Sequence, residues 1–135
     1  MTVQLGYVFV FVPDVSAAVS FYERAFGLGC RYLDGDGMFA ELETGSTVLA
    51  FADDDFASAA NGVVHRRSTP ESAAPGVSFT LVSDDVPGDW ARAVEAGATV
   101  VESPSAKPWG QVVGYLRDPN GLIVEVATAV DYDAA

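Results

Sequence analysis

Hydrophobic and polar positions in the first half of the chain predict a strand followed by a helix. Residues 7–12 read Tyr-Val-Phe-Val-Phe-Val, a run of β-branched and aromatic side chains that is typical of a strand. Apolar residues then recur at the spacing of a helix face, at Val15, Val19, Tyr22 and Phe26. Asp14 is a suitable N-cap for this helix, and Gly27 is a suitable residue to end it.

The same order of elements recurs in the second half of the chain. Residues 78–82 predict another strand. A second helical pattern follows, with its apolar face at Val86, Trp90, Ala93 and Val94. Asp85 and Gly97 hold the capping positions that Asp14 and Gly27 hold in the first half. This repetition indicates two similar modules.

A further strand and a hairpin are expected after each helix. The hairpin strands are expected at residues 38–43, 46–52, 111–117 and 122–128. The first hairpin turns at residues 44–45, and the second turns through Asp-Pro-Asn-Gly at residues 118–121. The second turn is the stronger signal, because proline fixes φ, asparagine tolerates the left-handed region and glycine adopts positive φ.

The pattern therefore predicts an α+β fold made of two βαβββ modules. They are expected at about residues 3–52 and 76–128, within a single domain that covers residues 1–135. The linker between them, about residues 53–75, is rich in Ala, Ser, Asp and Pro. This composition predicts a mobile loop or a short helical turn.

Alternation along the first strand of each module separates its side chains into two faces. In the second module one face is expected to pack on the helix, which leaves Ser78 and Thr80 on the other face. The corresponding face of the first module carries Tyr7, Phe9 and Phe11. Two such faces opposite each other would form a cup lined by aromatic and polar groups, which is typical of a ligand site.

Charge excludes several classes of partner. The chain has 19 acidic and 7 basic residues and a formal net charge of −12, whereas nucleic acids and anionic membranes attract clustered Lys and Arg. The first residues lack the basic segment of a signal peptide, and the apolar run at residues 7–13 is too short to span a bilayer, so a cytoplasmic protein is expected.

The charged tripeptides at 53–55 and 65–67 are expected to be solvated. Alternatively, the acidic residues 53–55 attract amines, and the basic residues 65–67 bind phosphate or carboxylate groups.

Several short motifs are spread over both halves of the chain. They are Val-Pro-Asp-Val at 12–15, Phe-Tyr at 21–22, Phe-Gly at 26–27, Asp-Val at 85–86, Glu-Ala-Gly-Ala at 95–98, Lys-Pro-Trp-Gly at 107–110, Tyr-Leu-Arg-Asp-Pro-Asn-Gly at 115–121, and Glu125. In combination they resemble the glyoxalase, bleomycin-resistance and extradiol-dioxygenase family, the vicinal oxygen chelate superfamily, over about residues 5–128. The resemblance implies a cup-shaped, eight-stranded mixed sheet with helices on its outer face. It also implies a homodimer, since pairing would cover exposed sheet edges.

The resemblance also implies positions for a metal site. Enzymes of this superfamily hold a divalent metal through four strand positions, typically His and Glu. These positions map onto Tyr7, Leu49, Ser78 and Glu125 in this chain. Glu125 alone among them is an ordinary metal ligand, and the one histidine, His65, lies in the linker. Because such a metal needs about three protein donors, no metal cofactor is expected.

The function favoured by the resemblance is metal-independent binding of a small planar or cationic, antibiotic-like molecule, as in the bleomycin-resistance proteins. The residues expected to contact this ligand are Tyr7, Phe9, Phe11, Leu49, Phe51, Ser78, Thr80, Trp109 and Glu125. Trp109 lies in a loop with Pro and Gly neighbours, where it is expected either at the rim of the site or in a dimer contact.

Three other functions are compatible with the same residues, because folds of this kind host several chemistries. The first is a metal-free isomerase or lyase in which Glu125 is the general base and Tyr7 the acid. The second is a metal-dependent glyoxalase- or dioxygenase-type enzyme whose metal site is completed by substrate or water. The third is a regulatory or interaction module with a vestigial cleft.

Overall fold

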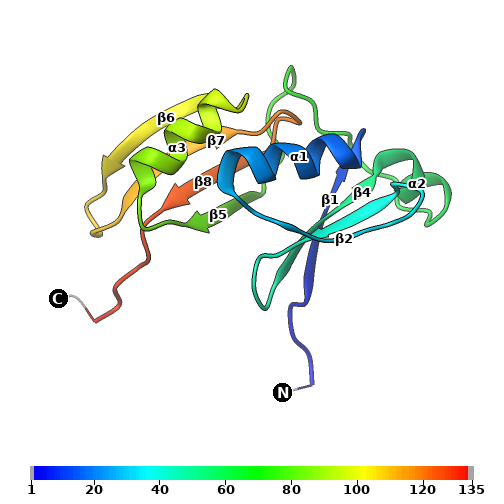
Figure 1. Cartoon of the computed structure of the whole chain (residues 1–135), viewed down its shortest axis with the longest axis horizontal. Coiled ribbons are helices and arrows are strands. Elements are labelled where there is room, and N and C mark those ends of the chain that lie inside the picture. Colours follow the sequence, from blue (N-terminus) through cyan, green and yellow to red (C-terminus); the bar gives the residue numbers. More distant parts are fainter. Residues whose placement is uncertain (1, 134–135) are drawn as a thin grey trace. The chain divides into compact units, whose positions relative to one another are not determined.

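The structure, a computed structural model, describes residues 2–133 and divides the chain into two compact units, residues 1–68 and 69–135. Each unit contains one βαβββ module (Figure 1). The eight strands are divided between two four-stranded mixed sheets, which confirms the predicted α+β fold. Within the described part of the chain, none of the helices is long and apolar enough to cross a membrane.

The first module is a sheet with strand order β1-β4-β3-β2. Its elements are β1 (Tyr7–Val12), α1 (Val15–Phe26), β2 (Cys30–Leu33), β3 (Phe39–Leu42), β4 (Val48–Asp53) and α2 (Asp54–Ala59). β1 and β4 run parallel, and the other two strand pairs are antiparallel. Helix α2 lies at the start of the predicted linker, so this part of the linker forms the short helical turn that was one of the two expectations.

Helix α1 begins and ends at the residues that the sequence predicts. Asp14 Oδ1 accepts a hydrogen bond from the backbone N–H of Ala17 (3.0 Å), and Gly27 ends the helix in the left-handed region with a φ of 69°. The helix packs on β3 and β4. Tyr22 of α1 lies against Phe51 of β4, with ring centroids 5.3 Å apart. These contacts form the core of the first module.

The register of β1 and β4 decides which side chains lie under α1. Val10 pairs with Phe51, and the side chains of directly paired residues point to the same side of a sheet. Because Phe51 contacts α1, this is the helix-covered face. Phe9 pairs with Ala50, so these two residues lie on the opposite face, which α1 leaves uncovered.

The second module repeats this plan with strand order β5-β8-β7-β6. Its elements are β5 (Ser78–Val82), α3 (Val86–Glu95), β6 (Thr99–Ala106), β7 (Val112–Arg117) and β8 (Ile123–Ala127). β5 and β8 run parallel, as β1 and β4 do. Strand β5 therefore corresponds to β1, and β8 corresponds to β4.

Helix α3 packs on its sheet through a tryptophan and a glycine. Asp85 caps the helix by accepting a hydrogen bond from Gly88 N–H (3.1 Å). Trp90 lies over Gly114 of β7, where a Cβ atom would lie 2.8 Å from Trp90 Cδ1. A glycine at this position leaves the space for the indole ring, whose Nε1 donates to Tyr115 O (3.3 Å).

The turn predicted at residues 118–121 is confirmed. The buried Asp118 accepts hydrogen bonds through Oδ1 from the backbone N–H groups of Asn120 (2.9 Å) and Leu122 (3.0 Å). Gly121 has a φ of 89°, a conformation that favours glycine. The turn therefore places the start of β8 through side-chain and backbone hydrogen bonds of its own residues.

Arg117, the last residue of β7, fastens part of the linker to the second module. Its guanidinium group donates to the carbonyl oxygens of Thr69 (3.2 Å), Pro70 (3.2 Å) and Ser72 (2.8 Å). It also donates to Gly121 O (2.9 Å). One side chain therefore ties the beginning of the second unit to its hairpin turn.

Candidate functional site

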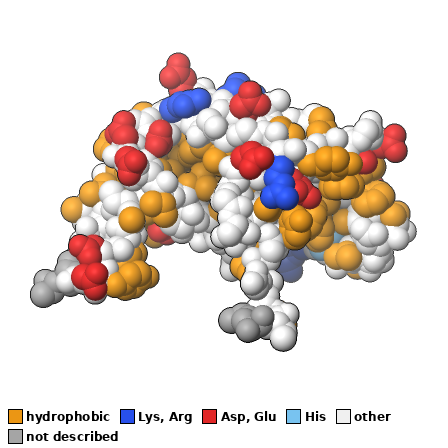
Figure 2. Space-filling view, turned by 60° about the horizontal axis from the view of Figure 1, so that its bottom comes forward, with side chains coloured by type: hydrophobic (Ala, Val, Ile, Leu, Met, Phe, Trp, Pro, Cys, Tyr) orange, Lys and Arg blue, Asp and Glu red, His pale blue; other side chains and the backbone are white. Residues whose placement is uncertain are grey.

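An apolar pocket of about 350 Å³ lies on the face of the first module that α1 leaves uncovered. Its lining residues come from β1, β3, β4, α2 and the segment after α2, and they are Phe9, Phe11, Phe39, Ala52, Phe56, Ala57, Asn61 and Val63. Phe11 pairs with Ala52, and Ala52 pairs with Phe39. The small side chain of Ala52 thus separates two phenylalanine rings in one row of the sheet. Figure 2 shows groups of hydrophobic side chains on the surface of the molecule.

Helix α2 forms one wall of the pocket, and local capping positions it. Asp53, the last residue of β4, accepts a hydrogen bond through Oδ1 from Phe56 N–H (3.0 Å), so the helix starts as soon as the strand ends. Asp54 and Asp55 occupy the first turn, where negative charge is favourable. This short helix brings Phe56 and Ala57 to the pocket.

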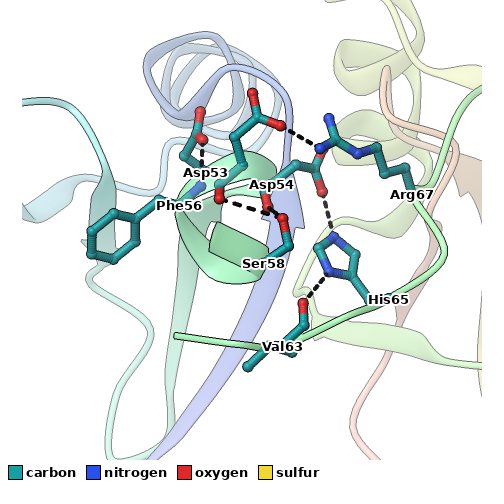
Figure 3. Close-up of polar contacts among 8 residues, drawn as sticks. Asp53, Asp54, Phe56, Ser58, Val63, His65 and Arg67 are labelled. Atoms are coloured by element: carbon teal, nitrogen blue, oxygen red, sulfur yellow. Dashed lines mark hydrogen bonds and ion pairs between the residues drawn. The ribbon is translucent and has the colours of Figure 1, made fainter. Parts of the chain in front are cut away.

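His65 connects α2 to Val63 in the segment that follows this helix (Figure 3). Its Nε2 lies 2.7 Å from Asp54 Oδ1, and its Nδ1 lies 3.0 Å from Val63 O. The imidazole ring also contacts Phe11, with ring centroids 4.6 Å apart. Asp54 is 2% exposed. The expectation that the two charged tripeptides are solvated is therefore wrong for His65 and Asp54.

These contacts change the acidity of His65. The hydrogen bond to Asp54 raises the pKa of His65 above its usual value of 6.5, and the hydrogen bond to Val63 O acts in the same direction. Burial and the charge of Arg67 act in the opposite direction with smaller effect. Arg67 itself forms an ion pair with Asp55 on the surface, and this hydrogen bond raises the pKa of Arg67.

The three aromatic residues of β1 share the uncovered face. Tyr7 and Phe9 are 50% and 44% exposed and stack on each other with ring centroids 6.1 Å apart. Phe9 and Phe11 line the pocket, and Tyr7 lies outside its lining. The structure therefore brings two of these residues together in the pocket and places the third next to them.

Leu49 and Phe51 do not share this face, and their placement among the ligand contacts is corrected. Phe51 is fully buried against Tyr22 of α1. Leu49 is also buried, and it lies two residues away on the same strand, so it points to the same side. Both side chains belong to the core under the helix.

The residue that corresponds to Glu125 in the first module is Ala50 rather than Leu49. Phe9 pairs with Ala50 in the parallel pair β1–β4. Thr80 pairs with Glu125 in the parallel pair β5–β8. Since β1 corresponds to β5 and β4 to β8, the assignment made from the sequence is displaced by one residue.

A row of polar side chains crosses the face of the second module opposite α3. Thr80 pairs with Glu125, Glu125 with Tyr115, and Tyr115 with Glu102. Ser78 lies two residues before Thr80 on the same face. Burial raises the pKa of the Tyr115 hydroxyl, and a hydrogen bond to Glu125 raises it further. Ser78, Thr80 and Glu125 thus share one face of this sheet.

Three residues of this polar face were not among the site residues predicted from the sequence. They are Tyr115, Glu102 and Lys107. Lys107 forms an ion pair with Glu102, and this hydrogen bond lowers the pKa of Glu102. Tyr115 follows Gly114, which faces α3. Because side chains alternate along a strand, this order places Tyr115 on the opposite, polar face. The sequence carried no such signal for the ion pair, because the register of β6 shifts between Glu102 and Ser105.

Trp109 lies on the surface of the second module in the loop between β6 and β7. It is 63% exposed, and its Nε1 donates to Gln111 Oε1 (2.7 Å). Gly110, with a φ of 100°, allows the loop to turn directly after the tryptophan. An indole exposed to this extent is available for contact with a ligand or with another protein chain.

The family model described as the Glyoxalase/Bleomycin resistance protein/Dioxygenase superfamily matches residues 4–126. The chain belongs to this superfamily. The match covers both modules, and it confirms the family inferred from the motifs of the sequence.

Relatives of this chain include proteins of mycobacteria. An uncharacterized protein of Mycobacterium bovis is 34% identical over 82% of this chain and 73% of its own length. An uncharacterized protein of Mycobacterium tuberculosis strain H37Rv is also 34% identical, over 82% of this chain. The chain spans 65% of the length of that second relative.

Solved structures similar to this chain have the same fold. A glyoxalase-related enzyme from Fulvimarina pelagi is 25% identical, with a TM-score of 0.76, and the match covers 93% of this chain and 88% of that one. Lactoylglutathione lyase from Agrobacterium tumefaciens is 25% identical with a TM-score of 0.68, covering 93% of each chain. TioX from Micromonospora sp. ML1 is 21% identical with a TM-score of 0.67, covering 93% of this chain and 98% of that one, and it shows the fold alone.

The positions to which the resemblance assigns the metal of the superfamily hold a single carboxylate in this chain. With the register of the structure, these positions are Tyr7 and Ala50 in the first module and Ser78 and Glu125 in the second. Within residues 2–133, no group of three or more His, Cys, Asp or Glu side chains is placed to hold a metal ion. Because zinc and similar ions need about three protein donors, this donor set does not fit the divalent metal of the superfamily's enzymes.

Proposed function

We propose that this protein binds a small, planar, largely uncharged organic molecule in the pocket of the first module without a metal ion. The observation that carries this proposal is the lining of the pocket, in which four phenylalanine rings surround about 350 Å³. The ring-bearing residues are Phe9, Phe11, Phe39 and Phe56. Aromatic faces of this kind stack on planar ligands and bury their apolar surface.

The charge of the pocket walls narrows the class of ligand. Asn61 is the polar side chain among the lining residues, and none of the lining residues carries a formal charge. A charged ligand would lose its hydration without gaining a counter-ion there. Of the two ligand types expected from the sequence, the planar one is therefore supported by the pocket, and Asn61 would orient a polar substituent through its amide.

A fluorescent probe tests this proposal. N-phenyl-1-naphthylamine carries flat aromatic rings and is uncharged near neutral pH, and its fluorescence rises in apolar sites. Phe9→Ala should weaken its binding about tenfold, or about 1.4 kcal/mol, because one stacking wall is lost. Leu33→Ala is the matched control, since Leu33 is similarly exposed but lies in the row of Ala40 and Phe51 on the helix face. Equal affinities of the two variants, or no binding by the unmodified protein, would refute the proposal.

A metal-free isomerase or lyase is the second candidate, because Tyr115 hydrogen bonds to Glu125. In this alternative Glu125 abstracts a proton from a carbon next to a carbonyl group, and Tyr115 rather than Tyr7 is its hydroxyl partner. Deuterium incorporation into a panel of such carbonyl compounds in D2O, followed by NMR, tests it. Exchange that Glu125→Gln abolishes, with probe binding unchanged, would favour the enzyme over the binding protein.

We also propose that the protein forms a homodimer. Each four-stranded sheet has two edge strands, β1 and β2 in the first module and β5 and β6 in the second. Such edges are commonly covered by another chain. Light scattering coupled to size-exclusion chromatography gives the mass, and a monomer at micromolar concentration would contradict the proposal. A cytoplasmic location and a role in antibiotic resistance stay predictions.

A further inference from the structure

His65 joins two walls of the apolar pocket to a buried carboxylate. Its imidazole ring contacts Phe11, a pocket residue on β1. Its Nδ1 lies 3.0 Å from the carbonyl oxygen of Val63, a second pocket residue. Its Nε2 lies 2.7 Å from Asp54 Oδ1 on α2. Figure 3 shows this chain of contacts from Val63 through His65 to Asp54.

The chemistry of these partners defines the protonation state of the ring. A backbone carbonyl and a carboxylate both accept hydrogen bonds, so both ring nitrogens must carry a proton. A neutral imidazole has one N–H and can satisfy only one of the two partners. The geometry therefore belongs to the imidazolium form, whose charge is balanced by Asp54, which is 2% exposed.

The other charged groups near His65 are engaged elsewhere. Arg67 is paired with Asp55 on the surface. Asp53 accepts the capping hydrogen bond of α2 from Phe56 N–H. From β1 the contact is the ring of Phe11, which carries no charge. The protonation of His65 thus depends mainly on Asp54, and not on a wider network of charges.

We propose that protonated His65 is a positioning residue for the ligand pocket, and that loss of its proton releases Val63 and weakens ligand binding. The released partner is Val63 because the hydrogen bond to the buried carboxylate is charge-assisted and therefore the stronger of the two. Neutral His65 keeps its Nε2–H on Asp54 and presents an unprotonated Nδ1 to the carbonyl of Val63. The pocket wall formed by Val63 then keeps only the backbone hydrogen bond that Val63 N–H donates to Ala57 O (3.0 Å). The ligand part of this inference rests on the proposed function.

The direction of the pH dependence follows from the raised pKa of His65. The contribution of the imidazolium to stability is fully present below about pH 6.5, the value of an unperturbed histidine, and is lost as pH rises through the higher pKa of the folded protein. The pocket is therefore expected to be ordered below the pKa that His65 has in the folded protein and to loosen above it. Ligand affinity should fall about three- to tenfold across this transition.

NMR resolves the titration without ambiguity, because the chain contains one histidine. In tag-free protein labelled with ¹⁵N and ¹³C, the Nδ1 resonance should move from the protonated to the unprotonated range as pH rises, while Nε2 stays protonated. The methyl resonances of Val63 should follow the same curve. Nδ1 that stays protonated while Nε2 titrates, or Val63 resonances that do not follow the ring, would overturn the inference in the free protein.

Binding of N-phenyl-1-naphthylamine between about pH 5.5 and about pH 9.5 tests the consequence for the ligand. His65→Gln should remove the pH dependence, because its amide cannot change charge. Arg67→Gln should keep the pH dependence with its midpoint moved to higher pH, because the charge of Arg67 lowers the pKa of His65 while Arg67 itself pairs with Asp55. By reciprocity, saturating probe should raise the pKa of His65 by the logarithm of the affinity ratio. Probe binding that is independent of pH would overturn this inference and leave the proposed function intact. A probe that does not bind at any pH would overturn the proposed function, and the NMR titration would then decide the role of His65.

Discussion

Truncating two phenylalanines on adjacent strands tests which face of the first module is the core and which carries the pocket. Phe51 of β4 is fully buried against Tyr22. Phe51→Ala should therefore lower the free energy of unfolding by about 3–5 kcal/mol, the sum of lost transfer energy and a residual cavity. Phe9 of β1 is 44% exposed and opens onto the pocket. Phe9→Ala leaves no closed cavity, so about half of the transfer term, roughly 1 kcal/mol, should be lost.

Urea unfolding followed by far-ultraviolet circular dichroism measures both values. Dichroism is the suitable signal because both tryptophans, Trp90 and Trp109, lie in the second module. The two variants should also differ in probe binding, since only Phe9 lines the pocket. If Phe9→Ala costs as much stability as Phe51→Ala, or if Phe51→Ala weakens probe binding without destabilising the fold, the assignment of the two faces is refuted.

Further predictions concern the turns and the polar face of the second module. Gly121→Ala should destabilise the protein by more than about 2 kcal/mol, because its φ is positive and a Cβ atom would lie 2.4 Å from Thr69 O. Gly45→Ala also has a positive φ but no atom within 4 Å of the added Cβ, so urea unfolding should show a loss of only about 1 kcal/mol. Tyr115→Phe removes the hydrogen bond to Glu125 and should cost about 1 kcal/mol in the same assay; an unchanged unfolding midpoint would show that this hydrogen bond adds no stability.

Elements defined by local signals were predictable from the sequence. Helix α1 is set by Asp14 at its start and Gly27 at its end, and the second hairpin is set by the turn at residues 118–121. Each of these signals acts within about five residues, so no tertiary information is needed to interpret them. The same signals recur in both halves of the chain, and this repetition predicts the two modules.

The error at Leu49 shows where such reasoning stops. The loops between β3 and β4 and between β7 and β8 span the same number of residues, but their positive-φ glycines occupy different positions. Gly45 corresponds in register to Asn120, and not to Gly121. Aligning the two glycines therefore displaces β4 by one residue, and in a strand a displacement of one residue moves every side chain to the opposite face.

Contacts between side chains that are distant in sequence could not be predicted. His65 meets Asp54 only because Asp53 starts α2 at the end of β4 and the chain then returns along this helix to β1. Composition alone predicted two solvated charged segments at these positions. The pocket beside them depends on the same return of the chain, since Val63 is one of its walls.

Duplication explains how one chain combines an aromatic pocket with a polar row. At corresponding positions of the first strands, Tyr7 and Phe9 stand in one module where Ser78 and Thr80 stand in the other. The two faces therefore carry different chemistry although the two modules share one plan of strands and helix. The neighbours of each face across the sheet lie within the same module. The apolar pocket belongs to the first module and the Glu125–Tyr115 pair to the second, so a variant in one should leave the chemistry of the other unchanged.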